Sequence, residues 1–210
     1  AALAVAAGGF PVTLVEREQQ LGGNLRQLSF TLETDNIPVL LDGLVKKIEE
    51  HPLIDLYLDS TIAAVEGYIG NFRSTLSHDE AVVEHGTVIV ATGAEEHYTT
   101  SYGYGTDPYI VTQREFETML LHGNPSLSRL DSIVMIQCVD SREEPRNYCS
   151  RVSCASTLKH ALHIKRKNPD AAIYVLYRDM MTYGFTESYF TEARKAGIIF
   201  IQYDLDHKPE

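Results

Sequence analysis

Three cysteines lie close together in the second half of the chain, at Cys138, Cys149 and Cys154. Cys138 follows an apolar run typical of a buried strand, and Cys154 opens a segment with helical spacing. Thiolates on such a loop can converge on a metal, and soft sulfur ligands favour an iron–sulfur cluster or zinc over oxygen-liking cations. A helix that starts at Cys154 would stabilise negative charge on a thiolate or cluster. The sequence therefore predicts a metal or redox site here.

Two histidines that follow Cys154 offer an alternative zinc site, completed by two of the cysteines. His160 and His163 share one helical face, but they lie about two to three turns beyond Cys154, so the loop would have to fold back. As surface or packing residues of an amphipathic helix they need no metal. The corresponding alternative for the cysteines is three buried, inert thiols. The residues alone leave these alternatives open.

Lys159 is the candidate catalytic residue. It lies within two turns of Cys154, where its positive charge can stabilise a reduced centre. The alternative is a solvated lysine on a basic face that runs from Lys159 to Lys167.

Three short signals in the first half of the chain are typical of a dinucleotide site. An acidic residue at the end of a strand accepts hydrogen bonds from adenosine ribose hydroxyls. Paired glycines let the backbone approach a ligand with no Cβ in the way. A strand that ends in Ala-Thr-Gly lets the backbone pass beside a cofactor. Each signal also suits an ordinary turn or strand end. The predicted cofactor-binding residues are Glu16, Gly22, Gly23, Asn24, Ala91, Thr92 and Gly93.

The elements that would position these residues follow an α/β pattern. The first half contains a helix end that stops at Gly8 and Gly9, and a helix over 37–51 with apolar residues on one face at Ile37, Leu40, Leu41, Leu44, Val45 and Ile48. Strands are predicted at 12–15, 54–58, 61–65, 72–76, 81–84 and 87–91. The second half alternates strands at 132–137, 172–176 and 198–201 with helices at 153–167 and 186–196, which predicts a parallel sheet.

Composition excludes some classes of function. The formal net charge is -11 and the sequence has no basic stripe, which argues against a nucleic-acid partner. The apolar runs are too short to cross a bilayer, so no membrane span is expected. An odd number of clustered cysteines suits a reducing compartment better than a disulfide framework. The opening residues lack the basic start of a signal peptide, and we expect a cytoplasmic location.

Together, and in this order, the three short signals resemble the flavoproteins related to thioredoxin reductase. The resemblance implies FAD and an α/β, Rossmann-like fold with two dinucleotide-binding domains, parallel sheets and a small β insertion. We expect a partial FAD-binding domain over residues 1–130, with a β-rich insertion at about 55–86, and a second Rossmann-like segment over 131–210. The boundary is predicted at Gly123–Arg129. The Gly-rich phosphate loop of that family would lie upstream of Ala1.

A closer resemblance covers essentially the whole chain. The stretch from Gln137 through Arg178 and Tyr183–Phe185 to Asp206–Glu210 is similar to the FAD-containing A subunit of heterodisulfide reductase, as are Thr112–Glu117 and Gly67–Phe72. The resemblance implies an enzyme of methanogenesis that transfers electrons through flavin and iron–sulfur centres toward disulfide reduction, with electron pairs split at the flavin. It implies an oligomeric complex with B- and C-like subunits and hydrogenase or ferredoxin-type donors.

The same resemblance implies the ligands of a four-iron cluster. In that family the loop reads Cys-Val-Gly-Ser-Arg and then Tyr-Cys-Ser-Arg-Val-Cys-Cys. This chain has Asp140 at the glycine position and Ser153 in place of one cysteine. Serine is a poor and rare iron ligand, so the cluster is expected to be absent, three-iron or completed by another group. The implied ligands are Cys138, Cys149, Ser153 and Cys154.

Two other functions remain as alternatives. A nicotinamide-dependent disulfide reductase would ordinarily need a Cys-x-x-Cys pair, which the sequence lacks. The first turn of the second α/β segment, at 137–142, also lacks GxGxxG, so we expect partner proteins rather than NAD(P)H as electron donors. The alternative outside catalysis is a zinc-stabilised or cofactor-free interaction domain.

Overall fold

The computed structural model describes residues 1–77, 80–123 and 130–210, and the chain forms two compact units. The first unit comprises residues 1–26 and 36–95, and the second comprises 27–35 and 96–210. The predicted boundary at Gly123–Arg129 falls almost entirely outside the described residues.

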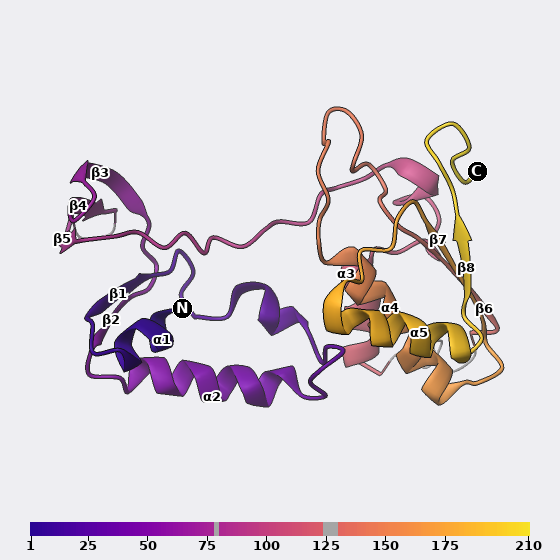
Figure 1. Ribbon diagram of the computed structural model, residues 1–210, viewed down its shortest axis with the longest axis horizontal. Coiled ribbons are helices and arrows are strands. Elements are labelled where there is room, and N and C mark those ends of the chain that lie inside the picture. The colour runs from indigo at the N-terminus through magenta and orange to yellow at the C-terminus, as the bar shows by residue number, and fades with distance from the viewer. Residues whose placement is uncertain (78–79, 124–129) are drawn as a thin grey trace. The chain divides into compact units, whose positions relative to one another are not determined.

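The first unit combines helices with one parallel and one antiparallel sheet (Figure 1). Its elements are α1 (Ala2–Ala7), β1 (Val12–Val15), η1 (Gly23–Gln27), α2 (Ile37–Glu49), β2 (Ile54–Tyr57), β3 (Ile62–Tyr68), β4 (Asn71–Leu76) and β5 (Val82–His85). β1 and β2 pair in parallel, with Val12 opposite Ile54. β3, β4 and β5 form the antiparallel sheet. The strands predicted at 54–58, 61–65, 72–76 and 81–84 are therefore present.

Local sequence explains where α2 begins. The Asn36 side chain accepts a hydrogen bond from the backbone N–H of Val39 at 3.1 Å, which caps the helix. Ile37 and Leu41 are buried, but the expectation for Leu40 is wrong, because its side chain is 44% exposed. The apolar stripe that contacts the β1–β2 sheet is thus narrower than the sequence suggests.

The strand predicted at 87–91 is not formed. These residues have no strand partner among the described part of the chain, and Val88, Ile89 and Val90 are exposed. A strand exists only through hydrogen bonds to a neighbouring strand, and among the described residues β1 and β2 pair only with each other. Within the described part of the chain, this apolar run of strand-forming residues is therefore unpaired.

The second unit contains a three-stranded parallel sheet in the order β6–β7–β8. Its elements are η2 (Ser101–Gly103), α3 (Gln113–Leu121), β6 (Ser132–Ile136), α4 (Ser153–Lys167), β7 (Ala172–Tyr177), η4 (Gly184–Thr186), α5 (Glu187–Lys195) and β8 (Ile199–Gln202). The helices and strands predicted for this half are confirmed. α4 and α5 lie side by side and pack against each other (Figure 1). The core includes Leu158 of α4, Ile173 and Val175 of β7 and Ala193 of α5, all fully buried.

Helix α3 is not among the predicted elements, although the chain carries a signal for it. Thr112 accepts a hydrogen bond from the Glu115 backbone, and Glu115 accepts one from the Thr112 backbone, which is a capping box. The pattern Thr-x-x-Glu before an apolar residue marks a helix start.

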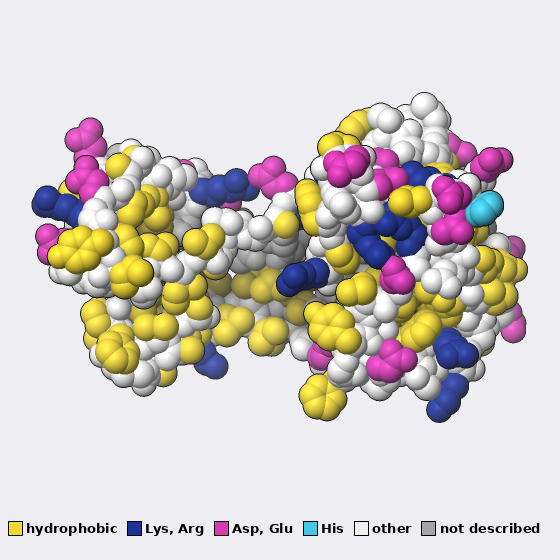
Figure 2. Space-filling model, turned by 45° about the horizontal axis from the view of Figure 1, so that its top comes forward, with side chains coloured by type: hydrophobic (Ala, Val, Ile, Leu, Met, Phe, Trp, Pro, Cys, Tyr) yellow, Lys and Arg dark blue, Asp and Glu magenta, His cyan; other side chains and the backbone are white. Residues whose placement is uncertain are grey.

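Charged side chains of both signs share the surface of the second unit. Figure 2 shows Lys and Arg side chains gathered on one face, with Asp and Glu side chains bordering them. Two ion pairs of this unit join Arg142 to Asp179 at 2.6 Å and Lys208 to Glu143 at 2.5 Å. Among the described residues, the helices are too short or too polar to cross a membrane.

Candidate functional site

The three dinucleotide signals of the first unit come together at the carboxyl end of β1. Glu16 is the first residue after this strand. The Asn24 side-chain amide donates to the carbonyl oxygen of Ala94 at 2.9 Å, which joins the Gly-Gly turn to the Ala-Thr-Gly segment. Arg17 pairs with Glu95 at 3.2 Å and joins the strand end to the same segment. All segments that carry predicted cofactor-binding residues therefore lie next to one another.

The Gly-Gly turn requires glycine at its first position. Gly22 has a φ of +122°, and a Cβ there would lie 2.9 Å from Leu41 Cδ2. Gly23 also has a positive φ, but a Cβ built on it would meet no heavy atom within 4 Å. The same holds for Gly93, with a φ of +70°. The backbone at Gly23 and Gly93 is thus open to a ligand.

The cysteine loop, residues 138–154, lies at the carboxyl edge of the β6–β7–β8 sheet. Cys138, Arg178 and Tyr203 each follow one of these three strands by one or two residues. The Tyr203 hydroxyl donates to the carbonyl oxygen of Gln137, and burial raises the Tyr203 pKa to about 12. Because the carboxyl ends of parallel strands meet at one edge, this is where α/β sheets usually bind ligands.

The start of the cysteine loop has an unusual backbone. Cys138, Asp140 and Arg142 all have positive φ angles of 50–60°. Residues other than Gly, Asn and Asp rarely adopt this region. The Asp140 carboxylate accepts hydrogen bonds from Thr99 Oγ1 at 2.5 Å and from Ser101 Oγ at 3.0 Å. Those bonds, the one from Thr99 first, lower the Asp140 pKa. The residue that replaces an expected glycine thus keeps a glycine-like conformation and gains two partners.

Two arginines hold this backbone in place. The Arg178 guanidinium donates to the carbonyl oxygens of Ser141 at 3.1 Å and Arg142 at 2.6 Å. Arg146 Nε donates to the carbonyl oxygen of Asp140 at 2.8 Å. The loop is therefore ordered by side chains that bind its carbonyl groups.

The three thiols have different surroundings. Cys138 Sγ accepts a weak contact from Arg142 Nη1 at 4.0 Å, and Cys149 Sγ accepts from the Arg151 backbone N–H at 3.3 Å. Cys154 is buried, its thiol lies 3.9 Å from the carbonyl oxygen of Asp179, and burial raises its pKa. Each sulfur thus has its own partner.

The predicted metal ligands do not form a metal-binding group. Ser153 Oγ accepts a hydrogen bond from Ser150 Oγ at 3.0 Å. Within residues 1–77, 80–123 and 130–210, no cluster of three or more His, Cys, Asp or Glu side chains is arranged to hold a metal ion. The donor set present here does not fit a four-iron cluster.

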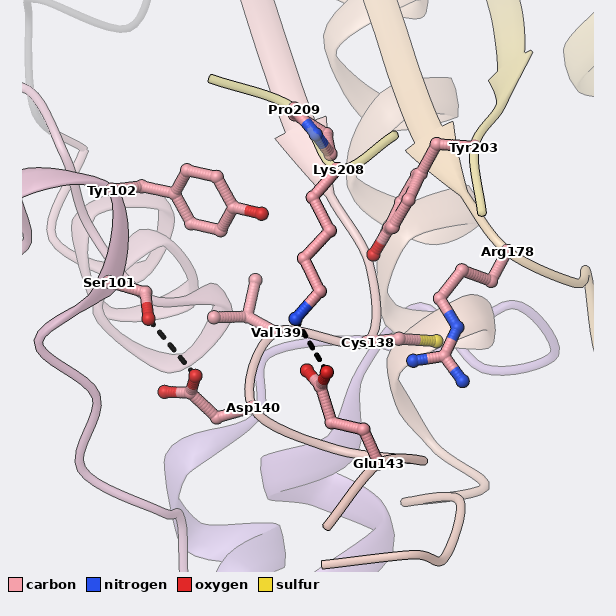
Figure 3. A pocket seen from close by; sticks show the side chains of 10 residues that line it. All are labelled: Ser101, Tyr102, Cys138, Val139, Asp140, Glu143, Arg178, Tyr203, Lys208 and Pro209. Carbon is pink, nitrogen blue, oxygen red and sulfur yellow. Dashed lines mark hydrogen bonds and ion pairs between the residues drawn. The ribbon is translucent and has the colours of Figure 1, made fainter. Parts of the chain in front are cut away.

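A cavity of about 260 Å³ opens beside Cys138 (Figure 3). Its lining includes Cys138, Asp140, Glu143, Arg178, Tyr203 and Lys208. A second cavity, of about 370 Å³, adjoins Cys149 and is lined by Tyr148, Arg151, Met181 and Tyr183. The cysteine loop therefore has a hollow at each of its two less buried thiols.

Lys159 is neither solvated nor on an exposed basic face, so that alternative is wrong. Its side chain is 6% exposed, and its Nζ lies 2.5 Å from Oε2 of Glu117, which is 1% exposed. The Nζ also donates to the carbonyl oxygen of Phe30 at 3.0 Å. The positive charge of Lys159 is therefore compensated by a buried carboxylate.

The same carboxylate binds His160 and Ser29, and these four side chains form an ion cluster between α3, α4 and residues 27–35. His160 Nε2 lies 2.5 Å from Glu117 Oε2, and His160 Nδ1 lies 2.5 Å from Gln113 Oε1. Ser29 donates to Glu117 Oε1 from its backbone nitrogen at 2.9 Å and from its hydroxyl at 2.8 Å. His160 thus acts in packing and hydrogen bonding, as its alternative interpretation proposed.

Charge balance in the ion cluster follows from its hydrogen bonds. Burial raises the pKa of Glu117, but hydrogen bonds from His160, Lys159 and Ser29 outweigh it and hold that pKa well below its ordinary value. Burial lowers the pKa of His160. Glu117 therefore stays ionised at neutral pH, with Lys159, His160 and Ser29 as its partners. His163 lies outside these bonds and stacks on Phe30 at 4.7 Å between ring centroids.

Comparisons with known proteins agree with this architecture. No family model matches the chain. The iron-sulfur A subunit (copy 1) of CoB–CoM heterodisulfide reductase from Methanopyrus kandleri is 28% identical over 302 aligned residues, covering 96% of this chain and 45% of that protein. The corresponding protein of Methanocaldococcus jannaschii is 25% identical over 96% of this chain and 45% of its own length. The resemblance to the A subunit of heterodisulfide reductase is confirmed.

The chain spans less than half the length of these relatives. The aligned region is longer than the 210 residues of this chain, so the relatives contain residues within it that this chain lacks. Among solved structures, thioredoxin reductase of T. acidophilum superposes with a TM-score of 0.50 at 12% identity, covering 96% of this chain and 59% of that one. The predicted Rossmann-like α/β fold class is confirmed.

Proposed function

We propose, from the likeness to the A subunit of heterodisulfide reductase, that this chain is part of an FAD-dependent oxidoreductase that exchanges electrons with partner proteins. The observation that supports this most directly is the pair of contacts Asn24–Ala94 and Arg17–Glu95. They join three segments, far apart in the sequence, that each carry a dinucleotide signal. If each signal were only an ordinary turn or strand end, the three segments would have no reason to lie beside one another.

The residues present fit the adenosine part of such a cofactor. Glu16 Oε1 accepts a hydrogen bond from the Glu18 backbone at 3.1 Å, which fixes the carboxylate at the strand end, where it would accept ribose hydroxyls. The open backbone at Gly23 and Gly93 would allow close approach, and Asn24 would hold the two segments together. When bound, FAD would supply electron transfer, and the protein would supply position and polarity.

The proposal does not include an iron–sulfur cluster. The thiols of Cys138, Cys149 and Cys154 have separate partners, and Ser153 is hydrogen-bonded to Ser150. No electron-transfer step is assigned to this loop.

The relatives are named as subunits, which supports a partner protein as electron donor or acceptor. Disulfide reduction and the splitting of electron pairs belong to the proposal for the whole protein. We assign neither reaction to the residues of this chain alone.

FAD binding tests the proposal. The chain is extended at its amino end to include the Gly-rich loop that the resemblance implies, and FAD affinity is measured from quenching of flavin fluorescence. We expect Glu16→Gln to weaken binding about tenfold, the size of one lost hydrogen bond to a charged group. Asn24→Ala should weaken it less, because Asn24 acts by holding the segments together.

Glu84→Gln is the matched control, since Glu84 is an exposed carboxylate on β5 and should leave FAD affinity unchanged. Equal affinities for wild type, Glu16→Gln and Asn24→Ala would contradict the assignment of this site. Absence of any flavin binding by the extended chain would contradict the proposed function itself.

A further inference from the structure

The second cavity, of about 370 Å³, lies where two segments of the second unit meet. Tyr148 and Arg151 come from the cysteine loop, and Met181 and Tyr183 come from the segment between β7 and η4. Both segments follow strands of the parallel sheet at its carboxyl edge, where α/β sheets usually bind ligands. The described lining contains no residue assigned to flavin. The proposed flavin function therefore does not account for this cavity.

Two tyrosine rings from different segments border the cavity. Tyr148 is 65% exposed and Tyr183 is 74% exposed, and Met181 beside them is also exposed. Among the described residues, neither tyrosine side chain forms a hydrogen bond or a ring contact. Phenol rings stack on other flat rings, and a methionine sulfur contacts aromatic rings favourably. The cavity is therefore suited to a flat aromatic molecule.

Arg151 supplies the charge of the cavity. The other arginines at this edge, Arg142, Arg146 and Arg178, all donate hydrogen bonds to acceptors of the protein. Arg151 is exposed, and its side chain has no hydrogen bond or ion pair within residues 1–77, 80–123 and 130–210. Its backbone N–H binds Cys149 Sγ at 3.3 Å, which fixes the start of the side chain. The described lining contains no Asp or Glu, so the cavity favours an anion.

We propose that the second cavity binds a small aromatic carboxylate. The ring lies against Tyr148 and Tyr183, and the planar guanidinium of Arg151 donates two parallel hydrogen bonds to the carboxylate. One arginine compensates a single negative charge, so a carboxylate fits better than a phosphate group, which carries nearly two. The cavity is near the lower end of the range of about 300–1,000 Å³ for ligand sites, so it admits one or two fused rings rather than a dinucleotide.

Three probes separate the contribution of the ring from that of the charge. The probe 2-naphthoate carries both, 2-naphthamide keeps the ring without the charge, and decahydro-2-naphthoate keeps the charge without the aromatic ring. Each is titrated into the 210-residue chain without flavin, and broadening of the probe's NMR signals gives the dissociation constant.

We expect 2-naphthoate to bind with a dissociation constant on the order of 1 mM, as is typical of a ligand of this size. The amide should bind about tenfold more weakly because it lacks the charged hydrogen bonds. The saturated acid should bind about fivefold more weakly because it cannot stack. Absence of 2-naphthoate binding, or an affinity for either analogue equal to that for 2-naphthoate, would overturn the proposal.

Variants of exposed residues locate the binding site. Arg151→Gln should weaken 2-naphthoate binding about tenfold and leave the affinity for the amide unchanged. Tyr183→Ala should weaken both aromatic probes about fivefold. Arg166→Gln and Tyr109→Ala are the matched controls, because both residues are exposed and lie outside the described lining. Unchanged binding in both Arg151→Gln and Tyr183→Ala would contradict this location, and the three probes on the wild-type chain remain decisive if a variant fails to fold.

Riboflavin distinguishes this cavity from a flavin site. It is added to the chain in the presence of 2-naphthoate, and we expect no displacement. Displacement that depends on Arg151 would assign the cavity to the flavin and overturn the proposal. Because the residues assigned to FAD lie in the first unit, failure of FAD binding by the extended chain would leave this test unaffected.

Discussion

Two polar regions of the second unit share helix α4 and differ in how completely their groups are paired. The ion cluster of Glu117, Lys159, His160 and Ser29 is almost wholly buried, and its charges compensate one another. The cysteine loop lies at the sheet edge, has a strained backbone and borders two cavities. Both regions contain residue types that do chemistry. Only the second leaves such a residue facing open space.

This difference shows that a buried charge close to a predicted redox site does not have to belong to that site. Lys159 lies about one and a half turns from Cys154 in the helix, but its Nζ already binds Glu117 and the carbonyl oxygen of Phe30. A group with its partners in place stabilises the fold. A group that lacks them, or faces a cavity, is available to a ligand.

The largest expected effect comes from removing the carboxylate of the ion cluster. Glu117→Gln leaves Lys159 buried without a counter-charge, and breaking a buried pair in this way costs about 3–5 kcal/mol. Urea unfolding followed by circular dichroism measures the loss. Glu192→Gln is the matched control, because Glu192 pairs with Arg166 at 3.4 Å on the surface and should change stability by less than about 1 kcal/mol. Equal effects would mean that the cluster is not a buried ion network.

A second variant tests whether the cost arises from unpaired charge. In Lys159→Met, Glu117 keeps the donors of Ser29 and His160, so this change should cost less than Glu117→Gln. The double variant should be more stable than Glu117→Gln alone by about 1–3 kcal/mol, since both charges are then removed. Simple additivity of the two losses in urea unfolding would show that the charges do not interact.

Most of the fold of the second unit is predictable from the sequence. β6, α4, β7, α5 and β8 have strong periodicity and lie within one or two residues of their predicted bounds. The prediction of a strand at 87–91 is wrong for a physical reason. These residues favour a strand, but a strand also needs a partner strand, and the periodicity of the sequence does not reveal one. The prediction that Leu40 is buried is wrong because an apolar residue on a helix face is buried only where another element covers it.

The candidate sites are predictable in part. The sequence places the flavin signals on the correct segments, but only the structure brings Asn24 to Ala94 across some seventy residues. Glu117 has no local signal of its own, and its role depends on contacts with α4 and Ser29 that no short pattern contains. The capping box at Thr112 would have predicted α3 and so placed Glu117 on a helix.

The two regions should also control opposite ends of the pH–stability profile. His160 has a lowered pKa in the folded state, so the folded chain binds fewer protons than the unfolded chain below the ordinary value of 6.5. Stability therefore falls as pH drops below about 6.5, and Glu117 adds a further loss below about 4.5. Cys154 has a raised pKa, so stability falls as pH rises above about 9.

Urea unfolding at several pH values checks this assignment. His160→Gln should flatten the acid limb near neutral pH, although His163, whose pKa is also lowered by burial, keeps part of the slope. Cys154→Ala should flatten the alkaline limb. An acid limb unchanged by His160→Gln would show that the histidine is not neutral in the folded chain.

The smallest expected effect tests the strained backbone of the cysteine loop. Asp140 has a φ of +50° and accepts hydrogen bonds from Thr99 and Ser101. Asp140→Gly loses those bonds but relieves the strain, whereas Asp140→Ala loses the bonds and keeps the strain. We expect the glycine variant to be more stable than the alanine variant by about 1 kcal/mol in urea unfolding. A more stable alanine variant would mean that the positive φ is not maintained. Because the ion cluster has no comparable strain, no substitution there should gain stability in this way. The difference in unfolding free energy between the glycine and alanine variants at position 140 therefore measures the cost of the loop conformation.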